Sequence, residues 1–330
     1  MNTGFRTSGP TAVELERRVG RSLRRRFGRR TDGNPEVLVS ISETYATVPM
    51  YDHILVPVDE SDPSSVALDH ALEIAADRNA TVSLLYVADT NEPSQTRLGT
   101  EVVDVLEETG EEVLADARDR ADAYDVTVRS KLVQGNPRDV IVRYGSSIGA
   151  DLVVMGTHGR GGLERYVLGS VAAHVANTAP MPVLTICGTD DSRATYPYET
   201  VLVPTDGSDH ATTALKHAAA VATQTDATLS LLTVLEESML GVGDDDERRA
   251  KAEELLDEAA STARSEGVED VVTAVESGSV AREISGYADT EGADLIVMGT
   301  HGRQGVDQHL LGSITERVLR TASVPVLTLN

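Results

Sequence analysis

The stretch Asp151-Leu152-Val153-Val154-Met155-Gly156-Thr157-His158-Gly159 is an apolar run followed by two glycines, and after nine intervening residues Gly169-Ser170 begins a segment with helical spacing. The pattern recurs as Asp294-Leu295-Ile296-Val297-Met298-Gly299-Thr300-His301-Gly302, again separated by nine residues from Gly312-Ser313. Such an apolar run predicts a buried strand, and glycines between it and a helix start let the backbone approach a phosphate closely. In a single copy, the glycines could simply mark an ordinary turn after the strand. Because two copies share one spacing, the sequence predicts a duplicated nucleotide site.

Strand and helix patterns alternate on either side of these glycines. In the first half we expect strands at 54–58, 81–87, 126–133, 152–155 and 183–187, with helices at 64–78, 101–124, 138–148 and 170–178. In the second half we expect strands at 201–205, 228–234, 271–275, 295–298 and 326–329, with helices at 211–223, 247–265, 281–290 and 314–321. Five strands joined by helical crossovers predict an α/β fold with a doubly wound parallel sheet in each half.

In such sheets ligands bind at the carboxyl ends of the strands, where the winding direction reverses. With a strand order of 3-2-1-4-5, that point lies between the first and fourth strands of each half. Asp59 and Asp206 end the first strands, and the glycine loops follow the fourth strands. This order therefore brings each aspartate to a glycine loop.

The chain divides into four parts by composition. Residues 1–49 carry nine arginines against five acidic residues, and are either a disordered basic extension or a stretch translated from an early start codon. Residues 50–187 and 198–330 are the two predicted nucleotide-binding domains, and the polar residues 188–197 link them.

The charge of the chain limits its partners. A net charge of −24 repels polyanions and argues against a nucleic-acid-binding body. No apolar stretch reaches the roughly 18–20 residues of a membrane span. The single Cys187 excludes an internal disulfide and is interpreted as a small core residue. The acidic excess with only three lysines resembles the composition of salt-adapted, haloarchaeal proteins of the cytoplasm.

Several residues near the glycines have two readings. Ser170 and Ser313 can donate a hydroxyl to phosphate or act as plain N-caps. Asp59 and Asp206 can contact a ligand or cap the following helix. His158 and His301 suggest acid–base groups, but no partnered carboxylate or nucleophile lies nearby in the sequence. This favours the interpretation that both are ordinary loop residues without a catalytic role. The Walker signature and the dinucleotide fingerprint are both absent.

The Gly-x2-Gly-x9-Gly-Ser spacing, the opening Ile54-Leu55-Val56-Pro57-Val58-Asp59 and the closing Val183-Leu184-Thr185 resemble the universal stress protein family in a tandem, two-domain form. The resemblance implies adenine-nucleotide-binding domains of strand order 3-2-1-4-5, paired through their last strands. Here 183–186 and 326–329 would pair within one chain as an intramolecular pseudo-dimer. A homodimer of the whole chain is also compatible with the resemblance.

The resemblance also implies the ligand contacts. In the first half these are an adenosine side at Asp59 and Val87, a ribose side at Met155 and Gly156, and a phosphate side at Gly159, Arg160, Gly169, Ser170 and Val171. The corresponding second-half residues are Asp206, Val234, Met298, Gly299, Gly302, Arg303, Gly312, Ser313, Ile314 and Thr315. Thr315 adds a hydroxyl in the second half, whereas Asp307 adds an acid to its loop. We therefore expect unequal affinities.

Three functions remain open at this level. The leading hypothesis is a non-catalytic stress-response regulator in the cytoplasm that binds ATP or a related adenine nucleotide, with or without Mg²⁺, and changes its assembly or partners. The second is a slow ATP hydrolase or nucleotidyl transferase, for which the sequence offers no evident base. The third is a structural stress module without a ligand.

Overall fold

The computed structural model of the protein describes residues 51–89, 95–98, 101–159, 168–187, 193–236, 245–302 and 311–330. Residues 49–330 form one compact unit, and the basic extension lies outside the described residues. The elements of the first half are β1 (His53–Pro57), α3 (Asp62–Arg78), β2 (Thr81–Asp89), β3 (Gln95–Leu98), β4 (Glu101–Asp104), α4 (Val105–Ala121), the 3-10 turn η1 (Asp122–Tyr124), β5 (Thr127–Gly135), α5 (Pro137–Ile148), β6 (Leu152–Gly156), α6 (Ser170–Thr178) and β7 (Val183–Ile186). Those of the second half are β8 (Thr200–Pro204), α7 (Asp209–Thr225), β9 (Thr228–Leu235), α8 (Asp245–Ser265), β10 (Val271–Ser277), α9 (Val280–Thr290), β11 (Leu295–Gly299), α10 (Ser313–Thr321) and β12 (Val326–Leu329).

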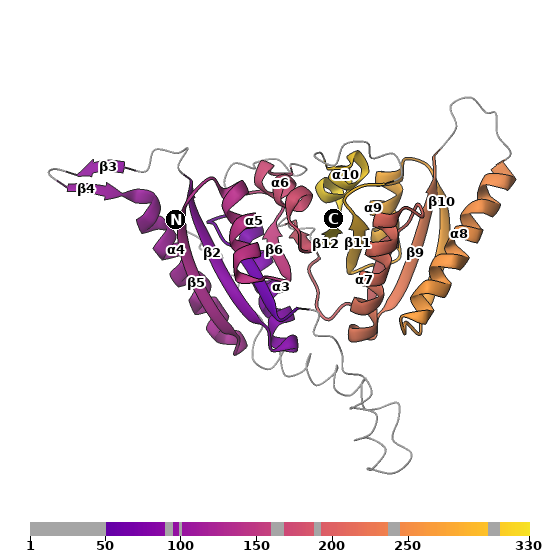
Figure 1. Cartoon of the computed structure of the whole chain (residues 1–330), viewed down its shortest axis with the longest axis horizontal. Coiled ribbons are helices and arrows are strands. Elements are labelled where there is room, and N and C mark those ends of the chain that lie inside the picture. Colours follow the sequence, from indigo (N-terminus) through magenta and orange to yellow (C-terminus); the bar gives the residue numbers. More distant parts are fainter. Residues whose placement is uncertain are drawn as a thin grey trace, which may run out of the picture. The chain divides into compact units, whose positions relative to one another are not determined.

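The two halves share one ten-stranded sheet, in the order β10-β9-β8-β11-β12-β7-β6-β1-β2-β5 (Figure 1). Within each half the strands are parallel and follow the order third, second, first, fourth, fifth. The halves join where β7 and β12 pair antiparallel, with Leu184 opposite Leu327. The expected pairing of the last strands is therefore present, and it merges the two five-stranded sheets into one.

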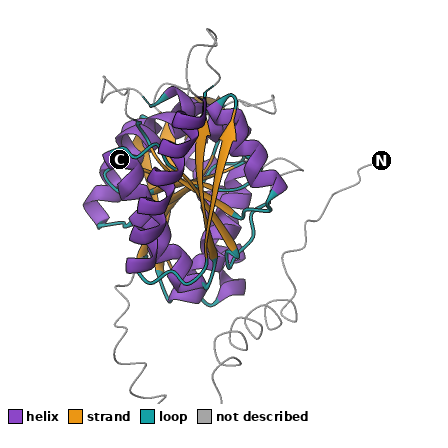
Figure 2. Cartoon of the chain, turned by 90° about the vertical axis from the view of Figure 1, so that its right-hand side faces the viewer, coloured by secondary structure: helices purple, strands orange, loops and turns teal. Residues whose placement is uncertain are grey.

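Helices cover both faces of the sheet (Figure 2). In the first half α3 packs beside α4 and α5 beside α6, and in the second half α7 packs beside α8 and α9 beside α10. The inner strands β7, β11 and β12 are buried throughout their length and β6 in all but its last residue, as is typical of parallel strands covered on both faces. The core is built mainly from Val, Leu, Ile and Ala, with some Met and Tyr side chains, and one hydrophobic cluster contains residues of both halves.

One predicted helix boundary is wrong. The charged stretch 101–124 was expected to be helical throughout, but residues 101–104 form β4, which pairs antiparallel with β3 in a two-stranded sheet of its own. The helix α4 starts only at Val105. Glu101-Val102-Val103 satisfies either a helical or an extended pattern, and the pairing with β3 selects the strand.

The antiparallel pairing of β7 and β12 forms the seam between the two halves. Two reciprocal tyrosine–histidine pairs join the halves close to this seam. The Tyr51 hydroxyl lies 2.7 Å from Nε2 of His217 on α7, and the Tyr198 hydroxyl lies 2.9 Å from Nε2 of His70 on α3. Each tyrosine precedes the first strand of its own half, and each histidine occupies the same position in the first helix of the other half. His70 and both tyrosines are buried. The pairs are thus related by the approximate twofold symmetry of the chain, and we call them the Tyr–His clasp.

The described part of the linker is tied to both halves. The backbone N–H of Arg193 donates to Ser323 O at 2.7 Å, and its guanidinium lies 2.9 Å from the Asp289 carboxylate. The Tyr196 hydroxyl donates to Asp77 at 2.8 Å.

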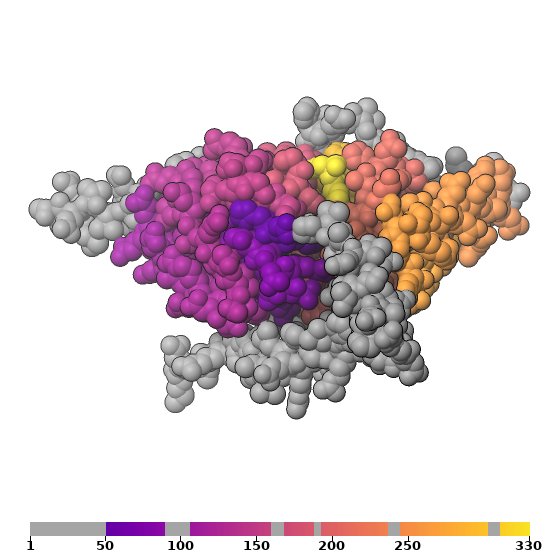
Figure 3. Space-filling view, turned by 60° about the horizontal axis from the view of Figure 1, so that its bottom comes forward, coloured from indigo at the N-terminus to yellow at the C-terminus, as the bar shows by residue number. Residues whose placement is uncertain are grey.

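Figure 3 shows the yellow C-terminal segment between the surfaces of the two halves and the orange helix α8 exposed at the surface of the second half. None of the helices in the described ranges is long and apolar enough to span a bilayer.

Candidate functional site

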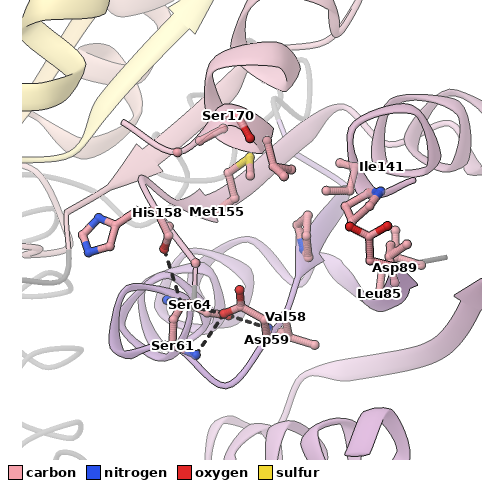
Figure 4. Close-up of a pocket in the computed structure, with 18 of the residues that line it drawn as sticks. Val58, Asp59, Ser61, Ser64, Leu85, Asp89, Ile141, Met155, His158 and Ser170 are labelled. Carbon is pink, nitrogen blue, oxygen red and sulfur yellow. Dashed lines mark hydrogen bonds between the residues drawn. The ribbon is translucent and has the colours of Figure 1, made fainter. Parts of the chain in front are cut away.

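Asp59 is held in a fixed position where β1 ends. Its Oδ1 accepts from the backbone N–H of Ser61 at 3.0 Å and from the Ser61 hydroxyl at 2.5 Å. The Ser61 hydroxyl in turn accepts from the N–H of Ser64 at 3.3 Å and caps α3, while the Ser64 hydroxyl accepts from the N–H of Asp59 at 3.0 Å. The helix cap is therefore Ser61, and Asp59 supports that cap (Figure 4).

The other oxygen of Asp59 faces the glycine loop. A Cβ at Gly159 would lie 2.6 Å from Asp59 Oδ2, closer than real Cβ contacts allow. Asp206 and Gly302 repeat this arrangement, with a corresponding distance of 2.8 Å. The predicted convergence of aspartate and glycine loop is thus present in both halves.

The glycines serve close packing rather than an unusual backbone turn. None of Gly156, Gly159, Gly169, Gly299, Gly302 and Gly312 has a positive φ, so none of them is required by a left-handed backbone conformation. At Gly156 a Cβ would lie 2.7 Å from Pro63 Cβ, and at Gly169 it would lie 3.2 Å from Thr157 O. The absence of a side chain lets β6, α3 and α6 approach one another at the candidate site.

The amino terminus of α6 carries amides that have no partner in the described part of the chain. Its N-cap is Gly169, without a side-chain cap, so Ser170 and Ser313 are first helical residues and not caps. The N–H of Gly169 donates to Thr157 O at 2.7 Å and therefore cannot also bind a ligand. The next three N–H groups, of Ser170, Val171 and Ala172, have no acceptor among the described residues. Three free amides at the positive end of a helix favour an anion.

These amides border a cavity of about 470 Å³ (Figure 4), a volume within the usual range of roughly 300–1,000 Å³ for small-molecule sites. Ser170, Val171 and Ala172 all line it, and Asp59 lies across from them. The remaining wall is largely apolar, with Leu85 and Val87 from β2, Pro137 and Ile141 from α5, and Met155 from β6. The cavity thus combines an anion-binding end with an apolar slot.

Eight predicted first-half residues line this one cavity: Asp59, Val87, Met155, Gly156, Gly159, Gly169, Ser170 and Val171. Arg160 lies outside the described residues. The sequence reading missed Ser61, Ser64, Asp89, Pro137 and Ile141, which also line the cavity. The sequence did contain a signal for Asp89. It follows Val87 by two residues and Leu85 by four, and residues at this spacing in a strand lie on the same face of the sheet.

His158 lines the cavity, but its ring is turned away from the Asp59 carboxylate (Figure 4). Its Nδ1 lies 3.2 Å from the Thr157 hydroxyl. Among the described residues no group of three His, Cys, Asp or Glu side chains could hold a metal ion. Among the described residues His158 has no carboxylate partner of the kind a general base needs.

In the second half, the amino end of α10 repeats the arrangement of backbone amides found at the amino end of α6. The N–H of Gly312 donates to Thr300 O at 2.9 Å, and the N–H groups of Ser313, Ile314 and Thr315 at the start of α10 have no acceptor among the described residues. Of the other predicted contacts, Val234 is the last residue but one of β9, Met298 and Gly299 end β11, and Gly302 follows them. Arg303 and the loop carrying Asp307 lie outside the described residues.

Two details distinguish the second half. The Thr315 hydroxyl donates to Gly299 O at 3.0 Å, so this predicted ligand donor is used within the fold and only its N–H is left for a ligand. His210 occupies the position of Pro63, and its ring lies 5.6 Å from that of His301, centroid to centroid. The two sites therefore share a backbone frame but present different side chains.

Comparison with known proteins gives a consistent result. The sequence model of the universal stress protein family matches residues 50–186 and again residues 197–330. Universal stress protein MJ0531 of Methanocaldococcus jannaschii is 36% identical over 141 residues, which cover 42% of this chain and 82% of that protein. A universal stress protein of Mycolicibacterium smegmatis is 28% identical over 294 residues and matches 84% of this chain and 96% of its own length.

Solved structures agree on the fold. The crystal structure of a universal stress protein from Archaeoglobus fulgidus superposes with a TM-score of 0.60 at 23% identity, over 85% of this chain and 98% of that one. At this identity the likeness concerns the fold alone.

Proposed function

Since the chain belongs to the universal stress protein family, with one family domain in each half, we propose that each half binds an adenine nucleotide, ATP or a close relative. The bound nucleotide acts as a signal that changes the assembly or the partners of a stress-response regulator. One observation carries the proposal: three amides of α6 that have no acceptor among the described residues border a cavity whose remaining wall is largely apolar, with Asp59 and Asp89 as its acidic residues.

The chemistry of the cavity matches the two ends of a nucleotide. The N–H groups of Ser170, Val171 and Ala172 would hold phosphate oxygens, each hydrogen bond to a charged group contributing roughly 1.5–3 kcal/mol. The base would lie against Leu85, Val87 and Ile141, and the ribose near Met155 and Gly156. In the second half Ser313, Ile314 and Thr315 would hold the phosphates, Val234 would contact the base, and Met298 and Gly299 the ribose. Mg²⁺, where present, would arrive with the phosphates and neutralise part of their charge.

A regulator fits the site better than an enzyme. Catalysis of phosphoryl transfer needs a group that positions the nucleophile, and the His158 ring is turned away from the Asp59 carboxylate. Release of inorganic phosphate measured during the binding experiment below tests this part of the proposal.

The direct test is calorimetric titration of the full chain with MgATP, preceded by analysis of any nucleotide that copurifies. We expect two sites per chain with unequal affinities. Val171→Asp and Ile314→Asp each add a carboxylate beside the free amides of one helix. The new charge favours the helix but repels phosphate, so each variant should fold and lose one site, with affinity there falling by at least about tenfold.

The matched control is Val272→Asp, which makes the same replacement at a half-exposed valine near the start of the edge strand β10. It should keep both sites. Absence of saturable binding by the wild-type chain, with and without Mg²⁺, would refute the proposal. If Val272→Asp lost binding to the same extent as Val171→Asp or Ile314→Asp, the proposal that the amino ends of α6 and α10 bind the phosphates would be wrong.

A further inference from the structure

The side chain of Asn330 connects structural parts of both candidate sites. Its Nδ2 donates to Ala179 O at 2.7 Å and to Ala176 O at 3.4 Å, in the first half. Its Oδ1 accepts from the Thr300 hydroxyl at 2.6 Å, in the second half. One carboxamide thus spans the seam with both of its polar atoms engaged.

The first-half end of this bridge is the carboxyl end of α6. Ala176 lies in the last turn of α6, and Ala179 is its C-cap. The amino end of this helix presents to the cavity the amides of Ser170, Val171 and Ala172, which no described residue accepts from. The helix has nine residues, so only about 13 Å of hydrogen-bonded backbone separates the proposed phosphate from Asn330.

The second-half end is the glycine loop itself. Thr300 is fully buried, and its N–H donates to Leu329 O at 2.9 Å. Its carbonyl accepts the N–H of Gly312, the N-cap of α10, at 2.9 Å. Its hydroxyl, besides contacting Asn330, lies 3.1 Å from Nδ1 of His301. Thr300 therefore fixes the start of the helix that presents the second set of free amides.

We propose that Asn330 couples the two nucleotide sites, so that a nucleotide bound in the first half raises the affinity of the second half. The inference rests on the proposed function and adds its regulation. A phosphate at the amino end of α6 polarises the peptide dipoles and makes the carbonyls of the last turn, Ala176 O among them, stronger acceptors. The hydrogen bond from Asn330 to Ala176 O strengthens, the Asn330 Oδ1 becomes a stronger acceptor, and Thr300 is held more firmly. By linkage the effect is reciprocal.

The alternative is that Asn330 only closes the end of α6, a common role for a polar side chain at a helix carboxyl end. A purely structural Asn330 would change stability but not the dependence of one site on the other. Thr328 supplies the control, because its hydroxyl also crosses the seam, donating to Val183 O at 3.2 Å. That bond joins β12 to β7 and involves neither α6 nor Thr300.

The experiment is a thermodynamic cycle on the full chain with MgATP as the probe. Val87→Trp fills the cavity of the first half with a neutral side chain away from α6, and Val234→Trp is the equivalent change at the proposed base contact of the second half. The affinity for MgATP is measured for each blocked variant, in which one site is open, and for both sites of the unblocked chain. The coupling factor is the affinity of a site when the other site holds nucleotide, divided by its affinity when the other site is blocked. The cycle is repeated with Asn330→Leu, which removes both contacts, with Asn330→Asp, which keeps the acceptor but loses the donors to α6, and with Thr328→Val.

We expect positive coupling of between about twofold and thirtyfold in the wild-type chain, unchanged in Thr328→Val. In both Asn330 variants the factor should fall to one, while the single-site affinities stay within about twofold. Two bound nucleotides with a wild-type factor of one would overturn the inference and leave the proposed function intact. Coupling that persists in both Asn330 variants, or that is lost equally in Thr328→Val, would also overturn it. Absence of any binding would overturn both.

Discussion

The Tyr–His clasp should make the pairing of the halves sensitive to acid. Burial lowers the pKa of both His70 and His217 to about 4, against about 6.5 in an unfolded chain. Nδ1 of His70 has no hydrogen-bond partner in the described part of the chain and lies 4.0 Å from the Glu73 carboxylate. That carboxylate favours the charged ring, but the cost of desolvating the charge outweighs it. Both histidines are therefore neutral in the folded chain at pH 7.

The sign and size of the effect follow from proton linkage. Between pH 6.5 and pH 4 the unfolded chain binds protons at these two positions and the folded chain does not, so the free energy of unfolding falls as the pH falls. The loss is about 1.4 kcal/mol per pH unit for each histidine, which gives about 3 kcal/mol each and about 6 kcal/mol together at pH 4. Above pH 6.5 neither histidine contributes a pH dependence.

The assay is urea unfolding of the full chain at pH 7, 6, 5 and 4.5. The double variant His70→Gln/His217→Gln should be less stable than the wild type at pH 7, yet lose less stability on acidification, by up to about 2.7 kcal/mol per pH unit. Tyr51→Phe/Tyr198→Phe should lose roughly 1 kcal/mol per hydrogen bond at every pH. It should keep the wild-type slope, because burial and not the hydroxyl depresses the pKa of each histidine. Equal slopes in the glutamine variant and the wild type would refute the reasoning.

Other changes test the packing and capping of single helices by thermal or urea unfolding at pH 7. Gly110→Ala should destabilise by about 1–3 kcal/mol, because a Cβ there would lie 2.5 Å from Cδ1 of the buried Tyr86. Gly286→Ala, also inside a helix but with no atom within 4 Å of the new Cβ, should stabilise by about 0.5–1 kcal/mol, and equal effects of the two changes would contradict the packing argument. Asn136→Ala should cost about 1 kcal/mol, because its Oδ1 accepts the N–H of Arg138 at 3.1 Å and caps α5; a neutral result would mean that solvent replaces this cap.

The sequence was sufficient for the features that repeat. Two apolar runs, each followed by the same glycine spacing, predicted strands whose carboxyl ends meet the aspartates of the first strands, and Asp59 does lie against Gly159. That prediction needs only the geometry of parallel sheets. The physical reason for the glycines was not readable in this way. Whether a glycine is needed for its φ or for its missing Cβ depends on which atoms approach it, and here those atoms belong to Pro63, Asp59 and Thr157.

Contacts between distant residues were also beyond the sequence. Tyr51 and His217 have no local pattern that relates them, because their contact depends on the antiparallel register of β7 and β12. The apolar slot was found only in part, since Pro137 and Ile141 reach it through the packing of α5 on β2. The hairpin at β3 and β4 was missed because a short stretch with two valines satisfies a helical as well as an extended pattern.

The seam between β7 and β12 also affects how such a protein can change over generations. In an assembly of identical subunits every mutation next to the twofold axis appears on both sides at once and must be tolerated twice. Here each side of the axis is encoded separately: His210 stands where the other half has Pro63, and Asn330 follows its strand where the other half has Cys187. Fusion into one polypeptide thus frees each copy of the fold to acquire its own residues while the shared sheet keeps the two together.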